Sequence, residues 1–178
     1  MTLHPVMNEI GKGLRLGLKV KTTNLADLPE ALALYRKRAF QYIELYVVPG
    51  TYEGTVAAWK SSGIPLILHA PHTADGVNIA DRALGPSNLR AYEEVLRFAA
   101  PLAASVIIVH GGCNGSLEEA VNQLGTIHDP RLHIENKPMM GLEGEICRGC
   151  SPEEIGIFLG NDQGWMVETD LPTADPER

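Results

Sequence analysis

Four side chains that can bind a metal ion each follow an apolar segment of the chain. They are the first residues after these segments: His69 after IPLIL (64–68), His110 after SVIIV (105–109), Glu135 after RLHI (131–134) and Glu168 after GWMV (164–167). Imidazole nitrogens and carboxylate oxygens bind zinc, manganese and iron. Two histidines and one glutamate also match a catalytic zinc site, in which one position stays open for water. The pattern predicts a divalent metal site, with zinc as the expected ion and manganese as the alternative.

The apolar segments belong to an alternation of strand and helix signals that runs along the chain. Two further strands are expected at 14–20 and 42–48. Helical patterns separate the strands at roughly thirty residues per unit, a period that suits βα repeats. Three of these helices are expected to begin with a capping box, at Asp27–Glu30, Ser116–Glu119 and Ser151–Glu154.

The continuous apolar character of the strands predicts a parallel sheet that is buried on both faces. The expected fold class is α/β, a TIM-barrel-like (β/α) repeat with about six βα units, which is an incomplete barrel. Catalytic residues of such folds lie at the carboxyl ends of the strands, and neighbouring strands are about 4.8 Å apart. Side chains that follow adjacent strands are therefore expected to converge on one ion.

Composition limits the classes of function. The 178 residues are enough for one domain, which is expected over 1–178. The net charge of −7 does not indicate the general basic surface of a nucleic-acid-binding protein. No apolar stretch reaches the roughly 18 residues of a membrane span, and no signal peptide is recognised. Three cysteines without a disulfide framework are typical of a reducing compartment, so a cytoplasmic protein with no membrane partner is expected.

Four motifs in order resemble those of the xylose isomerase-like TIM barrels, and among these the endonuclease IV group, the second family of apurinic endonucleases. The motifs are LILHAPH with VNIA, VIIVHGG, LHIENKPM and WMVETD. The resemblance covers six strands and nearly the whole chain. It implies that His69, His110 and Glu135 hold one metal, and that Glu135 bridges to a second metal shared with Glu168. It also implies hydrolysis of a phosphodiester at abasic sites in DNA, with Glu135 and Glu168 as the catalytic carboxylates.

The sequence departs from the pattern of that family at its end. The sixth strand carries Glu168 where the family has an aspartate, and Leu171 stands where a histidine is expected three residues later. The last two strands of the barrel are missing from the expected domain. An unclosed sheet leaves its first and last strands with unpaired edges, so a homo-oligomer is expected.

Other polar residues are candidates for substrate binding. His72 lies three residues after His69 and can reach a phosphate, Asn136 can orient a ligand, and Lys19 can meet an anionic substrate, although a solvated lysine is slightly preferred. Glu44 can point inward from the second strand. Cys113, Cys147 and Cys150 are interpreted as ordinary loop cysteines.

Two alternatives to the nuclease stay open. A metal-dependent sugar or sugar-phosphate isomerase or epimerase would need two acid–base groups beside a metal-bound sugar, and Glu135 and Glu168 supply half of such a set. The other alternative is a catalytically inactive truncated relative. The acidic charge mildly favours the sugar reaction, whereas the paired histidines His69 and His110 favour the nuclease more.

Overall fold

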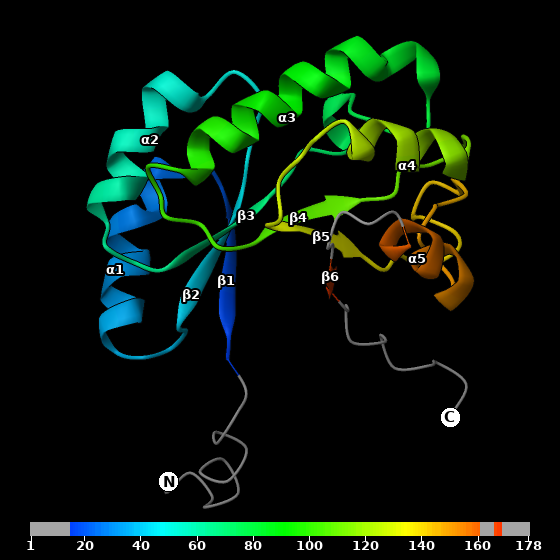
Figure 1. Ribbon diagram of the computed structural model, residues 1–178. Helices are drawn as coiled ribbons and strands as arrows, with labels where there is room; N and C mark the ends of the chain where they lie inside the picture. Colours follow the sequence, from blue (N-terminus) through cyan, green and yellow to red (C-terminus); the bar gives the residue numbers. More distant parts are fainter. Residues whose placement is uncertain (1–14, 161–165, 169–178) are drawn as a thin grey trace, which may run out of the picture.

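The chain forms one parallel sheet whose six strands follow chain order (Figure 1). The computed structural model describes residues 15–160 and 166–168. The strands are β1 (Gly17–Lys21), β2 (Tyr42–Tyr46), β3 (Leu66–His69), β4 (Ile107–His110), β5 (Leu132–Glu135) and β6 (Met166–Glu168). His69, His110, Glu135 and Glu168 are thus the last residues of their strands rather than the first residues of the loops.

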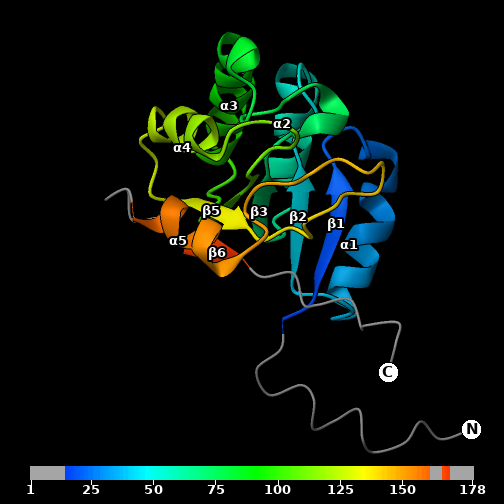
Figure 2. The same ribbon diagram turned by 90° about the vertical axis from the view of Figure 1, so that its right-hand side faces the viewer.

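Helices connect successive strands, as the βα pattern predicts (Figures 1 and 2). They are α1 (Leu28–Arg36), α2 (Tyr52–Ser61), α3 (Gly85–Ala99), α4 (Leu117–Gly125) and α5 (Pro152–Leu159). Three short 3-10 turns, η2 (Leu25–Asp27), η3 (Thr73–Asp75) and η4 (Arg82–Leu84), complete the described connections.

Two of the three predicted caps are confirmed. Ser116 and Ser151 accept hydrogen bonds from the backbone N–H groups three residues later, at 3.3 and 3.2 Å. Asp27 makes no cap hydrogen bond to α1, and its carboxylate accepts instead from the side chain of Asn24 at 3.1 Å. A local alternative partner therefore replaces the expected capping box.

The hydrophobic core lies between the helices and only one face of the sheet. The alternate strand residues Leu45, Leu68, Ile107 and Ile134 are buried in one cluster with side chains of the helices. The other face carries polar residues on every strand whose side chains the structure describes: Lys19, Glu44, His69, His110 and Glu135. The expected burial of both faces holds on the central strands, where His69 and Glu135 are buried, but this second face is polar because it carries the candidate site.

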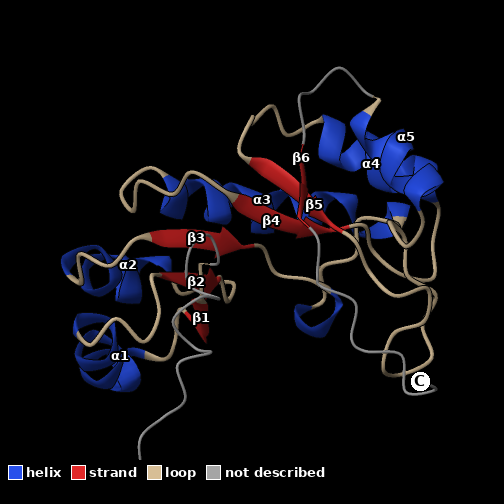
Figure 3. Ribbon diagram, turned by 90° about the horizontal axis from the view of Figure 1, so that it is seen from below, coloured by secondary structure: helices blue, strands red, loops and turns tan. Residues whose placement is uncertain are grey.

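The sheet is not closed. Among the described strands, β1 pairs only with β2 and β6 pairs only with β5, so the row in Figure 3 has two separate ends. This arrangement confirms the expected incomplete barrel. Within the described part of the chain, no helix combines the length and the apolar character that crossing a membrane requires.

Replacing Phe98 of α3 by alanine is expected to lower the free energy of unfolding by about 3–5 kcal/mol, because the ring is completely buried between helix and sheet. Urea titration measures the change. Ile157→Ala is the matched control, because this side chain is 50% exposed and should cost less than about 1 kcal/mol. Equal effects of the two substitutions would contradict the described core.

Candidate metal centre

The register of the parallel strands brings three predicted ligands to one face of the sheet. His110 of β4 and Glu135 of β5 are direct partners in the register. His69 of β3 is the partner of Ile108, two residues before His110. Because side chains alternate along a strand, this even offset keeps His69 on the same face as the other two.

The three ligand atoms converge closely. Glu135 Oε2 lies 2.6 Å from His110 Nε2 and 3.3 Å from His69 Nε2, and the two Nε2 atoms lie 3.1 Å apart. His69 and Glu135 are buried, and the side chain of His110 is 15% exposed. The convergence of three ligating atoms was therefore predictable from the ends of the strands.

Counting protons shows that these three atoms suit a cation. His69 Nδ1 lies 2.8 Å from the carbonyl oxygen of Ala70, which can only accept, so Nδ1 carries the proton and Nε2 of the neutral ring carries a lone pair. Glu135 Oε2 is also an acceptor, and His110 Nε2 can direct at most one N–H between them. In the neutral form of His69, the Nε2 lone pair faces Glu135 Oε2 at 3.3 Å, an arrangement that a bound cation would compensate.

The spacing also fits a tetrahedral ion. Bonds of about 2.1 Å to nitrogen and oxygen place ligand atoms about 3.4 Å apart, close to the distances around His69. The His110–Glu135 contact of 2.6 Å would lengthen by less than about 1 Å. Burial lowers the pKa of His110 to about 4, so its ring is neutral and able to ligate at physiological pH.

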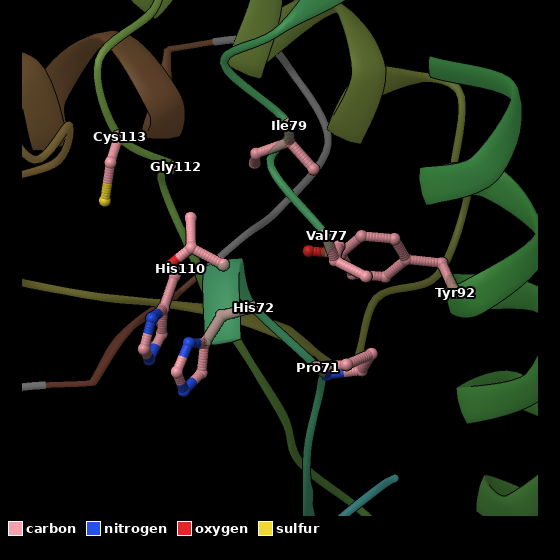
Figure 4. Close-up of a pocket in the computed structure, with 9 residues that line it drawn as sticks. Pro71, His72, Val77, Ile79, Tyr92, His110, Gly112 and Cys113 are labelled. Carbon is pink, nitrogen blue, oxygen red and sulfur yellow. The ribbon is translucent and has the colours of Figure 1, made fainter. Parts of the chain in front are cut away.

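His72 and Tyr46 surround the centre. The His72 ring stacks on that of His110 with centroids 4.5 Å apart and 12° between the planes, as Figure 4 shows. The ring centroids of Tyr46 and His69 lie 5.2 Å apart. The Tyr46 hydroxyl donates to Asp75 and accepts from the backbone N–H of His72 at 3.2 Å. Burial, followed by the hydrogen bond to Asp75, raises the pKa of Tyr46, so the phenol stays protonated. These contacts hold the loop after β3 against the centre.

A cavity of about 640 Å³ opens beside the centre, and two lysines line it. Lys137 Nζ lies 4.0 Å from Glu135 Oε1, and Lys19 Nζ lies 2.7 Å from Glu44 Oε1. Glu44 lies on the same face of the sheet as the centre and pairs with Lys19, and its role beside the centre stays a prediction. The predicted residues His72 and Lys19 line the cavity, which is consistent with contact to an anionic substrate.

Two other predicted residues are placed less completely. Glu168 is the partner of Glu135 in the register between β5 and β6, so its backbone stands at the level of the centre. Its side chain lies outside the described part of the structure. Asn136 follows Glu135 and is half-buried, and its role in orienting a ligand stays a prediction.

Sequence reasoning missed Tyr46 and Lys137. Tyr46 ends β2 at the level of His69 in the register. The strand was expected to run on to residue 48, so the strand-end rule did not select Tyr46. Lys137 lies within the ENKP stretch, two residues after Glu135, where no strand-end rule selects it.

The three cysteines occupy two different environments. Cys150 Sγ donates to Glu154 Oε2 at 3.4 Å near the start of α5, as an ordinary loop cysteine does. Cys113 and Cys147 both line the cavity, with their sulfur atoms 3.6 Å apart. Burial, and then the hydrogen bond to Cys147, raises the pKa of Cys113 to about 12, so this thiol is protonated at neutral pH.

Three solved structures share this fold. Endonuclease IV from Thermus thermophilus superposes with a TM-score of 0.67 at 19% identity, covering 88% of this chain and 62% of that one. A D-tagatose 3-epimerase-like protein gives 0.65 at 15% identity, with 88% and 65% covered. The TTHB071 protein from the same Thermus species, soaked with ZnCl2, gives 0.66 at 19% identity, with 88% and 66% covered.

These likenesses confirm the expected fold class, a (β/α) barrel-like repeat with part of the barrel present. The chain spans less than two thirds of the length of the endonuclease and of the epimerase-like protein. No protein-family model matches the chain. No curated protein matches it either. At these identities the likenesses establish the architecture alone.

Lowering the pH is expected to destabilise the metal-free protein through His110. Its pKa is about 4 in the folded chain against 6.5 in the unfolded chain, so between these values the unfolded state binds more protons. From pH 7 to pH 5, this histidine alone should reduce the free energy of unfolding by about 2 kcal/mol. Urea titrations in the presence of a chelator measure the reduction.

His110→Asn should remove that part of the pH dependence, and His128→Asn, which replaces an exposed histidine, should leave it intact. If the free energy of unfolding of His110→Asn depends on pH as in the wild type, His110 is not the group whose protonation destabilises the folded chain.

Proposed function

We propose that this chain is a metal-dependent phosphodiester hydrolase of the endonuclease IV kind, which acts at abasic sites in DNA. The observation that carries the proposal is the convergence of His69, His110 and Glu135 on one point. The likeness to endonuclease IV supports it at the level of fold. Zinc is the proposed ion and manganese the alternative, because the donors are two imidazoles and one carboxylate.

The proposed ligands are His69, His110 and Glu135, with Glu168 completing a second position beside Glu135. A metal held there would lower the pKa of its bound water and neutralise charge on the phosphate. Glu135 and Glu168 are the proposed catalytic carboxylates. The carbonyl of Ala70 fixes the His69 ring with Nε2 directed at Glu135, which keeps this nitrogen ready to bind the ion.

The substrate is proposed to enter through the cavity beside the centre. His72 Nδ1 accepts a hydrogen bond from the backbone N–H of Ala74, so its Nε2–H is the donor that can reach a phosphate oxygen. Burial lowers the pKa of His72, so it acts as a neutral donor. Lys137 and Lys19 supply positive charge on the same cavity wall, and Asn136 is proposed to orient Glu135.

Incubation of the full chain with zinc and a duplex that contains one abasic site tests this function. We expect strand cleavage at that site, and we expect a chelator to abolish it. His69→Ala should reduce cleavage by more than about 100-fold, because it removes a direct ligand. His128→Ala, which replaces an exposed histidine, is the matched control.

Absence of cleavage by a chain that holds zinc through His69 would contradict the nuclease proposal. Cleavage that persists in His69→Ala or in the chelator would do the same, because the activity would then come from another site or a contaminant.

A sugar isomerase or epimerase is the second candidate, favoured by the likeness to the D-tagatose 3-epimerase-like protein. Glu135 and Glu168 are partners in the register of neighbouring strands, so their carboxylates would supply part of the acid–base set that this reaction requires. This candidate predicts that the metal-loaded chain leaves the abasic duplex intact and interconverts ketohexoses. Chromatography of the sugars before and after incubation separates the two candidates.

Self-association through the sheet edges is part of the proposal. In the described residues, β1 and β6 each have one edge without a partner strand, and such edges pair readily with another chain. Light scattering of the purified chain should give a mass that is a multiple of that of one chain. A single species with the mass of one chain would contradict association.

A further inference from the structure

A second group of metal-binding side chains lies on the wall of the same cavity. Cys113 in the loop after β4 and Cys147 in the loop after β5 face each other as an antiparallel bridge. The hydrogen bonds that flank them run from Asn114 N to Ile146 O at 2.8 Å and from Arg148 N to Gly112 O at 2.9 Å. The cysteines are therefore a non-hydrogen-bonded pair, in which side chains come closest.

The sulfur atoms already have the separation of a metal-bound pair. Their distance is 3.6 Å, and two bonds of about 2.3 Å at a tetrahedral angle would place them about 3.8 Å apart. A disulfide needs the much shorter distance of about 2.05 Å. Glu145 adds a carboxylate oxygen, so that all three ligand atoms lie within 4.8 Å of one another. The two sulfurs are therefore reduced thiols in contact, and their spacing fits an ion held between the three side chains.

The backbone holds both cysteines in place. Asn78 donates from Nδ2 to the carbonyl of Cys113 at 2.8 Å and accepts from its N–H through Oδ1 at 2.9 Å. A Cβ added to Gly115 would lie 2.1 Å from the carbonyl oxygen of Ala80, so the loop packs directly on that segment. On the other side, Cys147 N donates to Met139 O at 3.0 Å. A site fixed by its surroundings binds an ion with less ordering cost.

We propose that Cys113, Cys147 and Glu145 form a second metal site, which binds a thiophilic divalent cation such as zinc. Each thiol would exchange its proton for the ion, and all three side chains line the cavity. The site shares no ligand with the centre at His69, His110 and Glu135. It therefore stands whether or not the chain is a nuclease.

Cadmium titration of the full chain, freed of metal and kept reduced, tests this site. Cadmium bound by thiolates gives a charge-transfer absorption in the ultraviolet that imidazole and carboxylate ligands do not give. We expect the band to saturate at one cadmium per chain. Cys113→Ser should weaken or abolish it, and Glu145→Gln should keep the band but weaken cadmium binding by about tenfold or more.

The chain offers two matched controls. Cys150→Ser removes the cysteine that is bonded to Glu154 outside the site and should leave the titration unchanged. His69→Ala disables the other centre and should also keep the band, which separates this proposal from the nuclease. Far-ultraviolet circular dichroism of Cys113→Ser checks that the variant is folded.

Absence of the band from the reduced wild-type chain would overturn the proposal, as would a band that survives intact in folded Cys113→Ser. Formation of a Cys113–Cys147 disulfide with oxidised glutathione, by a chain that binds no cadmium when reduced, would assign the pair to redox chemistry instead.

Discussion

The register of three neighbouring parallel strands is the constraint on which the candidate centre depends. His110 and Glu135 are direct partners, and His69 is displaced from that level by an even number of residues. A shift of either pairing by one residue would send a ligand into the helix-packed core on the opposite face. The buried apolar cluster between sheet and helices fixes this register. The same strand pairing therefore positions the core residues on one face and the three ligands on the other.

Burial then sets the chemistry of the centre. His110 is kept neutral by desolvation, and the carbonyl of Ala70 directs the lone pair of His69 toward Glu135. The result is a largely buried cluster of two imidazoles and one carboxylate, whose close contacts a bound cation would compensate. The same cluster makes the folded chain less stable at low pH, because unfolding allows His110 to take up a proton that burial excludes in the folded chain.

The loops after β4 and β5 give the cavity its second set of donors. They pair with each other at the short antiparallel bridge Cys113–Cys147, and a second bridge, Met140–Ile146, lies within the loop after β5. This pairing places the two sulfur atoms in the lining of the cavity to which His110, Glu135 and Lys137 also belong. Nitrogen, oxygen and sulfur donors thus line one cavity, which allows ions that prefer different ligand atoms to bind there.

The sequence by itself determined the alternation of strands and helices, the serine caps of α4 and α5, and the residues His69, His110 and Glu135 at the strand ends. These features depend on neighbours within a few positions along the chain. Tertiary structure decided which strand face is polar, the contact of Tyr46 and Lys137 with the centre, and the meeting of Cys113 with Cys147. Each of these depends on strand register or on the pairing of distant loops, because side-chain contacts across a sheet are set by packing rather than by local spacing.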